Sequence, residues 1–364
     1  MKIIHCSDIH LESPLRLNFS AQKAKERRAE IFESFCGLVG YAEAKNVKAV
    51  IIAGDLFDTD DVSERVKRGV EDVIRLHGGI SFFLLRGNHD KTAGLFDKTG
   101  VPGNLKLFDA GRWTAYDLDG VTVSGINPPY EYSDGLCGGP RLDPGGLNIA
   151  VMHGAAVNYK SGDMTDAVLL PQLRDKNIDY LALGHYHNFF RADLDKRGIY
   201  CYSGCLEGRG FDESGKKGFV LIDADAQNKK LTAQFVAFCK RTVYDLTVDI
   251  TGVRSMYALE TAVLGALADL EPSDIAGLTL RGGREPLLHI DLERLSEIAN
   301  GRVYYCKIAD ESRLAIDPSD YAGDLSLKGE FIRLVSNDAG LSPDEKSAVI
   351  ERGLKAMDGG GRGI

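Results

Sequence analysis

Short apolar runs and helical patterns alternate along the first 240 residues of the chain. Apolar runs bounded by turn residues predict strands, and apolar residues that recur at helical spacing predict helices between them. The predicted strands span residues 2–6, 48–53, 80–85, 147–152, 179–183, 217–223 and 231–238, with a hairpin over 114–125 around Asp119-Gly120. The predicted helices span residues 21–45, 62–76 and a stretch near 165–176. This alternation is typical of an α/β sandwich.

The pattern changes after residue 240. Strands are predicted over 244–250, 286–290 and 302–308, and helices over 256–270, 292–299, 327–337 and 343–357. We therefore expect a first domain over residues 1–240, a smaller α/β domain over 241–325, and a terminal helical pair over 326–358.

Composition narrows the class of protein. Of the 364 residues, 44% are hydrophobic and 27% are charged, which is typical of a globular protein and excludes a disordered chain. No apolar stretch reaches the roughly 18 residues that a membrane span requires. The N-terminus reaches Asp8 before an apolar signal region could form, and the seven cysteines form no CxxC pair. We therefore expect a cytoplasmic protein without a disulfide framework.

The net charge of −9 argues at first against a nucleic acid partner. The charge is unevenly distributed, however: residues 1–240 carry 30 basic and 32 acidic side chains, and residues 241–364 carry 14 and 21. The first domain is therefore nearly neutral. Weak, salt-sensitive binding of nucleic acid by the protein alone remains compatible with this distribution.

Five short motifs follow predicted buried strands. They are Asp8-Ile9-His10, Gly54-Asp55, Gly87-Asn88-His89-Asp90, His153-Gly154 and Gly184-His185-Tyr186-His187. Ligands of open α/β sheets bind at the carboxyl ends of the strands, so these side chains are expected to meet at one edge. One such motif is weak evidence, whereas five at the same structural position indicate a functional site.

The donor types predict a pair of divalent cations. We expect Asp55 to bridge the two metals. One metal would be completed by Asp8, His10 and His187, and the other by Asn88, His153 and His185. A mixed nitrogen and oxygen set without thiolate favours manganese, iron or zinc over calcium, with magnesium a further option.

His89 adjoins a proposed ligand and has no metal in this assignment. A histidine beside a metal-bound phosphoester can protonate the leaving oxygen, so we predict a catalytic role for His89. Asp58, three residues beyond Asp55, is a candidate carboxylate to orient His89, or alternatively an acid near a helix N-terminus. Arg209, Lys216 and Lys217 follow the motif strands and are candidate contacts to nucleic acid.

The ordered series D-x-H, GD, GNHD, H and GHxH over residues 8–187 resembles the calcineurin-like metallophosphoesterase superfamily. The opening Ile4–Leu11, the run Gly54–Asp58 and the segment Tyr202–Glu213 resemble the SbcD-type DNA repair nucleases, and within them the shorter YhaO-like bacterial branch. Family members carry proline where this chain has Ser203, and often Ser-Pro in place of Cys205-Leu206. These departures fall in a loop expected to face nucleic acid and are expected to leave the metal ligands intact.

The resemblance implies a four-layer metallophosphoesterase β-sandwich flanked by helices, with a smaller α/β capping domain. It implies a manganese-dependent 3′→5′ exonuclease or single-strand endonuclease acting on DNA. The terminal helices, including Gly329–Leu334, resemble the segment that docks on a coiled-coil ABC ATPase of the SbcC type, and a homodimer is compatible with the family. One alternative is a metallophosphatase or phosphodiesterase for a small nucleotide or another phosphoester. Another is a scaffold without metal, which the complete ligand set disfavours.

Overall fold

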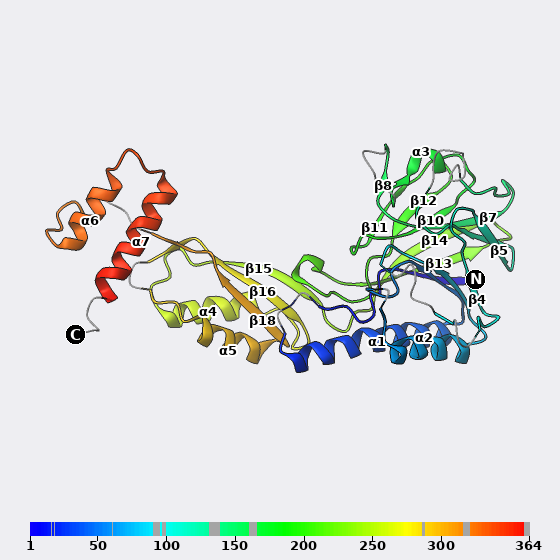
Figure 1. The fold of residues 1–364 in the computed structure, drawn as a ribbon, viewed down its shortest axis with the longest axis horizontal. Coiled ribbons are helices and arrows are strands. Elements are labelled where there is room, and N and C mark those ends of the chain that lie inside the picture. The colour runs from blue at the N-terminus through cyan, green and yellow to red at the C-terminus, as the bar shows by residue number, and fades with distance from the viewer. Residues whose placement is uncertain are drawn as a thin grey trace. The chain divides into compact units, whose positions relative to one another are not determined.

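The computed structural model describes residues 1–15, 17, 19–59, 61–89, 95–96, 100–130, 139–159, 166–285, 288–315 and 321–359. Asp90, which belongs to the third motif, lies outside these residues. The chain divides into two compact units, Met1–Val243 and Tyr244–Ile364. The sequence pattern predicts this boundary at residue 240. Figure 1 shows the elements of both units.

The first unit contains two six-stranded sheets. The first sheet has the strand order β14-β13-β1-β2-β3-β4. Its strands are β1 (Lys2–Cys6), β2 (Val47–Ala53), β3 (Ser81–Leu85), β4 (Leu105–Leu107), β13 (Gly218–Asp225) and β14 (Lys230–Ala237). Strands β1, β2, β3 and β4 pair in parallel, and β13 is antiparallel to β1.

The second sheet has the order β11-β12-β10-β7-β6-β5. Its strands are β5 (Thr114–Leu118), β6 (Val121–Gly125), β7 (Leu147–His153), β10 (Tyr180–Gly184), β11 (Phe190–Asp193) and β12 (Ile199–Tyr202). The central strands β6, β7, β10 and β12 are parallel, and the predicted hairpin forms β5 and β6. The short strands β8 (Ala156–Val157) and β9 (Val168–Leu169) pair separately.

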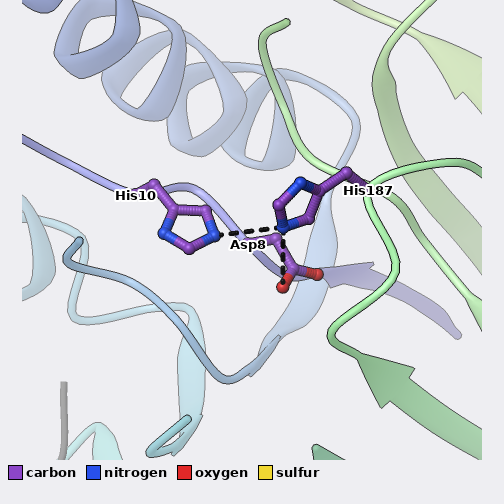
Figure 2. A group of neighbouring side chains, drawn as sticks. All are labelled: Asp8, His10 and His187. Atoms are coloured by element: carbon purple, nitrogen blue, oxygen red, sulfur yellow. Dashed lines mark hydrogen bonds and ion pairs between the residues drawn. The ribbon is translucent and has the colours of Figure 1, made fainter. Parts of the chain in front are cut away.

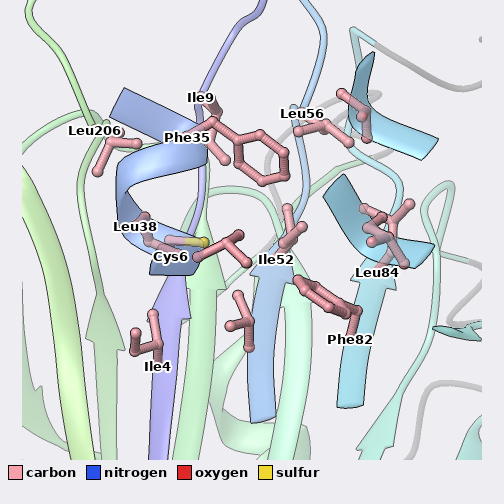
Figure 3. Close-up of a cluster of buried hydrophobic side chains, with 14 of the residues drawn as sticks. Ile4, Cys6, Ile9, Phe35, Leu38, Ile52, Leu56, Phe82, Leu84 and Leu206 are labelled. Carbon is pink, nitrogen blue, oxygen red and sulfur yellow. The ribbon is translucent and has the colours of Figure 1, made fainter. Parts of the chain in front are cut away.

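Alternating side chains of the first sheet build two different cores. Ile4, Cys6 and Ile52 pack with helices α1 (Ala21–Ala44) and α2 (Glu64–Leu76), as Figure 3 shows for part of this cluster. Ile3 and Ile51 belong to a second core, which they share with residues of the second sheet. The first unit is therefore a sandwich of two mixed sheets with helices on the outer face of the first sheet. The parallel strands are buried on both faces, which explains their nearly continuous apolar runs.

The predicted helix near 165–176 is wrong in its length. The structure has only α3 (Leu170–Leu173), and residues 160–165 lie outside the described part of the chain. Asp175 and Asn177 adopt positive φ angles of 59° and 64°, which an α-helix cannot accommodate. The outer core of the second sheet is instead completed by loop residues such as Ile126, Tyr130 and Leu194.

The second unit is built on a three-stranded sheet of β15 (Val243–Asp249), β16 (Ile275–Arg281) and β18 (Tyr305–Asp310). Helices α4 (Met256–Ala266) and α5 (Leu292–Arg302) share one hydrophobic core with this sheet. The strand predicted over 286–290 is wrong, because residues 288–290 are irregular. Residues 286–287 lie outside the described part of the chain. The sequence reading missed β16, whose Ile275–Leu278 run is buried at the centre of the sheet.

The second unit also contains a helical pair with its own small core. Helices α6 (Leu327–Ser336) and α7 (Pro343–Gly359) meet through Ile332, Ile350 and Leu354. The two-residue strands β17 (Gly283–Arg284) and β19 (Arg313–Leu314) pair with each other. Among the helices of the described residues, none combines the length and apolar character needed to cross a membrane.

Candidate metal centre

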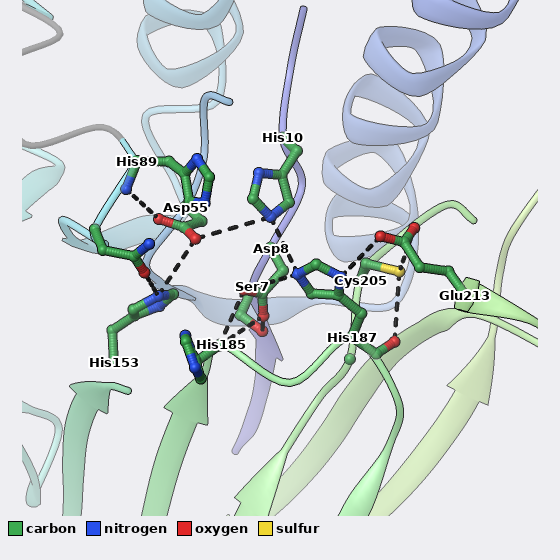
Figure 4. Close-up of polar contacts among 12 residues, drawn as sticks. Ser7, Asp8, His10, Asp55, His89, His153, His185, His187, Cys205 and Glu213 are labelled. Atoms are coloured by element: carbon green, nitrogen blue, oxygen red, sulfur yellow. Dashed lines mark hydrogen bonds and ion pairs between the residues drawn. The ribbon is translucent and has the colours of Figure 1, made fainter. Parts of the chain in front are cut away.

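All five motifs lie at the carboxyl ends of parallel strands of the first unit. Asp8 and His10 follow β1, Asp55 follows β2, and Asn88 follows β3. In the second sheet, His153 is the last residue of β7, and the His185–His187 segment follows β10. The loops after β1 and β2 continue side by side, because Asp8 N donates to Gly54 O at 3.0 Å and His10 N donates to Asp55 O at 3.0 Å. The strand ends therefore deliver the motif side chains to one place (Figure 4).

The backbone is held in an unusual conformation at these positions. Asp8, His10 and Asp55 have φ angles near +50°, and His185 has a φ of 114°. Residues other than glycine rarely adopt positive φ angles. The conformation is strained, so contacts with the surrounding structure must stabilise it. Gly87 shows how tightly the loops are packed, since a Cβ atom there would lie 1.9 Å from Asp55 Oδ1.

A first group joins Asp8, His10 and His187, which Figure 2 shows converging from two loops. The Nε2 atoms of the two histidines lie 3.3 Å apart, and Nε2 of His187 lies 3.9 Å from Asp8 Oδ1. Asp8 and His10 are buried, whereas the side chain of His187 is 29% exposed. One metal ion could contact all three groups, because their ligand atoms all lie within 4.8 Å of one another.

A second group joins Asp8, Asp55 and His153. His153 Nε2 lies 3.3 Å from Asp55 Oδ2 and 2.9 Å from Asn88 Oδ1. The same Asp55 oxygen lies 3.8 Å from His10 Nε2, so one carboxylate faces an imidazole of each group. The His185 ring lies beside His153, with 5.7 Å between the ring centroids. The structure thus brings all seven residues proposed as metal ligands together at one edge.

Three of the imidazoles have an oxygen atom within 3 Å of Nδ1. His10 Nδ1 lies 2.9 Å from Asp58 Oδ1, His153 Nδ1 lies 2.9 Å from Ala53 O, and His187 Nδ1 lies 2.7 Å from Glu213 Oε1. An oxygen acceptor at Nδ1 places the proton there and leaves the lone pair at Nε2. In the groups above it is the Nε2 atoms that converge. The donor set therefore fits a pair of divalent cations held by imidazole nitrogen and by carboxylate and amide oxygen.

The electrostatics of the site favour ionised carboxylates. Burial favours a raised pKa for Asp55, but the hydrogen bond and charge of His153 outweigh it and hold the pKa below its usual range. Burial would lower the pKa of His153, and Asp55 raises it instead. For Glu213, burial is likewise outweighed by His187 and Arg209, so its pKa is lowered. The site accordingly keeps its carboxylates ionised around the proposed ligands.

His89 lies at the exposed side of the group. Its backbone N–H donates to Asp55 Oδ1 at 3.0 Å, and its ring packs edge-on against His10 with 5.1 Å between centroids. Asp58 was expected to orient His89 through its carboxylate. That carboxylate contacts His10 and Arg209, and it is the Asp58 backbone carbonyl that lies 3.0 Å from His89 Nδ1. His10, Asp58 and His89 form a third group that could hold a metal, because their ligand atoms all lie within 4.8 Å of one another.

Two of the three predicted nucleic acid contacts are internal. The Arg209 side chain is 7% exposed and contacts Asp58 and Glu213 at 2.7 Å each. Lys217 is 2% exposed, and its Nζ donates to His187 O at 3.0 Å. Their position in the chain predicts a place near the cleft. In the structure both side chains are buried, and their charged groups contact other residues of the protein. Lys216 alone of the three is exposed.

The sequence reading missed three residues that contact the proposed ligands directly or through one neighbour. Glu213 orients His187, Ser7 Oγ donates to Asp8 Oδ2, and Ser203 Oγ lies 2.8 Å from Ser7 Oγ. Ser203 was expected to leave the ligands unaffected, yet it reaches Asp8 through Ser7. The segment Tyr202–Glu213 was recognised as a family feature, but no spacing distinguished Glu213 from other acids.

Comparison with known proteins supports this reading of the site. The model of the calcineurin-like phosphoesterase family matches residues 1–189, just over half of the chain. The DNA double-strand break repair protein Mre11 of Methanosarcina acetivorans is 24% identical over 95% of this chain and 57% of its own length. The Mre11 protein of Aeropyrum pernix is 28% identical over 83% of this chain and 75% of its own.

The uncharacterized metallophosphoesterase YhaO of Bacillus subtilis is 24% identical over 71% of this chain and 65% of its own length. The chain thus spans less than two thirds of the length of the Methanosarcina Mre11 protein and of YhaO. The family match covers β1 through β10 and so includes every residue proposed as a metal ligand. The chain belongs to the calcineurin-like phosphoesterase family.

Proposed function

We propose that this protein is a two-metal phosphodiesterase that cleaves DNA, with manganese as the metal. The observation that carries the proposal is the convergence of Nε2 and carboxylate atoms from five strand ends around Asp55. The remainder of the site supports it, because separate residues fix the orientation of His10, His153 and His187.

The residues divide into two sets around the metals. Asp8, His10 and His187 would hold one ion, Asn88, His153 and His185 the other, and Asp55 would contact both. When bound, the two ions supply a nucleophilic hydroxide and neutralise charge on the phosphoryl oxygens. The oriented imidazoles keep the ion positions fixed, which limits the reorganisation needed during the reaction.

His89 is proposed as the group that protonates the leaving oxygen. Because the Asp58 carbonyl accepts from Nδ1, the free edge of the ring presents Nε2. When the ring is protonated at both nitrogens, the proton at Nε2 can pass to the departing alkoxide at the exposed side of the site. Asp58 then acts on two histidines at once, through its carbonyl on His89 and its carboxylate on His10.

DNA as the substrate rests on the relatives. Two of the similar proteins are named for DNA double-strand break repair. The reaction would be 3′→5′ exonucleolytic or single-strand endonucleolytic cleavage, and the second unit would serve as a cap that helps to hold DNA. A small phosphoester is the alternative substrate, and the experiment below distinguishes the two.

An ATPase partner belongs to the same proposal. Leu325, just before α6, and Leu327 and Leu334 within α6 have 96%, 75% and 65% of their surface exposed. Exposed leucines clustered along one segment are unfavourable in water and typical of a protein interface. We propose that this segment docks on a coiled-coil ABC ATPase of the SbcC type, and that the protein can act as a homodimer.

The decisive experiment measures hydrolysis by the purified protein with manganese. Labelled single- and double-stranded DNA and bis-p-nitrophenyl phosphate are the substrates, and His89→Ala is compared with wild type. We expect DNA cleavage by the wild type and a 10²- to 10⁴-fold lower rate, in order of magnitude, for His89→Ala. His77→Ala serves as the matched control, since His77 ends α2 away from the motifs. Cleavage of the small ester without any action on DNA would refute the nuclease and favour the alternative.

A further inference from the structure

A pocket of about 460 Å³ opens beside the candidate metal centre. Four aromatic side chains line it: Tyr186, Phe190, Tyr200 and Tyr202. They come from the loop after β10 and from strands β11 and β12, so the pocket lies wholly within the first unit. His187 lines it as well, and His187 is also a member of the first metal group (Figure 4). A ligand in this pocket would therefore adjoin the metals.

The floor of the pocket is rigid. Tyr202 is 1% exposed, and its hydroxyl accepts from Ala156 N at 2.7 Å and donates to Gly154 O at 2.8 Å. Tyr186 packs against Tyr202 with 4.8 Å between ring centroids. The floor is therefore set before any ligand arrives, which lowers the entropic cost of binding.

The rim, in contrast, exposes aromatic surface. The side chains of Tyr186 and Phe190 are 48% and 50% exposed, and Phe190 lies 5.9 Å from Tyr200 between centroids. Exposed rings around a concave site are the usual platform for stacking a flat ligand. Among the described residues that line the pocket, none is an acid, a lysine or an arginine, so the chemistry suits a neutral ring.

One polar side chain in the pocket could orient a bound ligand. Asn188 lines it, and its Oδ1 accepts from the buried ammonium of Lys217. This contact fixes the amide, so its NH₂ is the group that a ligand can use as a donor. An acceptor atom on the edge of a heterocycle would complement it.

We propose that this pocket holds the base of the nucleotide whose phosphate the metals bind. The inference rests on the proposed function and deepens it, because it gives the phosphodiesterase a nucleotide-binding subsite. Stacking on aromatic side chains accepts every base and requires an unpaired one. The substrate class is thus a nucleic acid end or single strand, in which the base is free to leave the helical stack.

Calorimetric titration of the metal-free protein tests the proposal apart from catalysis. The ligands are 2′-deoxyadenosine 5′-monophosphate and 2-deoxyribose 5-phosphate, which differ only in the base. We expect the nucleotide to bind roughly 5- to 100-fold more tightly than the sugar phosphate. Phe190→Ala and Tyr186→Ala should lose most of this difference, and Tyr186→Phe should retain it. Tyr159→Ala removes a 78% exposed ring outside the pocket and should behave as wild type.

Equal affinity of the wild type for the two ligands would overturn the proposal, as would variants that keep the full difference. Hydrolysis of bis-p-nitrophenyl phosphate, measured on the same preparation with manganese, reports on the proposed function separately. Hydrolysis without base-dependent binding would refute the pocket alone. Base-dependent binding without hydrolysis would refute the phosphodiesterase and leave a nucleotide-binding site.

Discussion

Glu213 is predicted to control metal affinity without touching the metal. Its carboxylate lies 2.7 Å from His187 Nδ1 and binds Arg209 through the side chain and the backbone N–H. Arg209 Nη2 also lies 3.3 Å from the same His187 nitrogen. Since arginine can only donate, a protonated Nδ1 is compatible with Glu213 and not with Arg209 as its partner. The carboxylate therefore keeps the His187 lone pair at Nε2, facing Asp8 and His10.

The magnitude follows from what Glu213→Ala removes. Without the carboxylate, Arg209 is the nearest partner of Nδ1, and an arginine donor favours the tautomer that carries its proton at Nε2. That tautomer cannot bind a metal through Nε2. Loss of such an orienting partner costs 10- to 100-fold in metal affinity, or about 1.4 to 2.8 kcal/mol. Glu213→Gln should lie between wild type and alanine, because its amide oxygen can still accept from Nδ1.

The assay is manganese titration with detection of bound metal by calorimetry. We expect the binding step that involves His187 to weaken in Glu213→Ala while the stoichiometry at saturating metal stays the same. Asp117→Ala removes an exposed carboxylate on β5 and is the matched control. If Glu213→Ala bound manganese with the affinity of wild type, the tautomer argument would be refuted. Equal weakening in both would indicate a long-range effect of net charge instead.

Three further predictions concern the surrounding network. Glu207→Ala should lower the free energy of unfolding by about 3 kcal/mol in a urea titration, because it removes one of the two carboxylates that the buried Arg27 contacts and leaves Glu30 and the Gly208 carbonyl as its partners. The melting temperature of wild type should exceed that of Glu30→Gln most at neutral pH. This difference should shrink below about pH 4. The reason is that Arg241 and Arg27 hold the Glu30 pKa below its usual range against the opposite effect of burial, and the stabilisation is lost as pH falls through that lowered value. Ser203→Ala should weaken manganese binding a few-fold in the same calorimetric assay, and unchanged binding would show that Ser7 needs no partner.

The sequence predicted the strands that carry the site well, because they are buried parallel strands. Residues 2–6 form β1 as predicted, and the predicted hairpin of 114–125 forms β5 and β6. Such strands appear in the sequence as a continuous apolar run that ends abruptly at a polar motif. Both the kind of element and its last residue can therefore be predicted from the sequence. Two elements that were missed or predicted too long lack this signal. The strand β11 is short and mostly exposed, and α3 is a single turn.

The proposed ligands could be read from the sequence because each follows a strand directly. What orients them could not be read in this way. Glu213 lies in a 3₁₀ turn, 26 residues after His187, and Ala53 acts through its backbone oxygen. A carbonyl group has no sequence signature, and a single acid in a loop resembles any other. Asp58 is a candidate because it lies three residues after Asp55 in the sequence. Which of its oxygens contacts His10 and which contacts His89 depends on the local backbone conformation.

Arg209 and Lys217 illustrate the limit of reasoning from position. Both follow the last motif in the chain, and a cation near a phosphate-binding cleft is expected to bind phosphate. In the structure Arg209 lies between Asp58 and Glu213, which orient His10 and His187 respectively. One buried guanidinium therefore stabilises the carboxylates that fix two proposed ligands from different sheets. A phosphate contact by Arg209 would require it to leave both acids, so positive charge for the substrate must come from the metals and from exposed side chains such as Lys216.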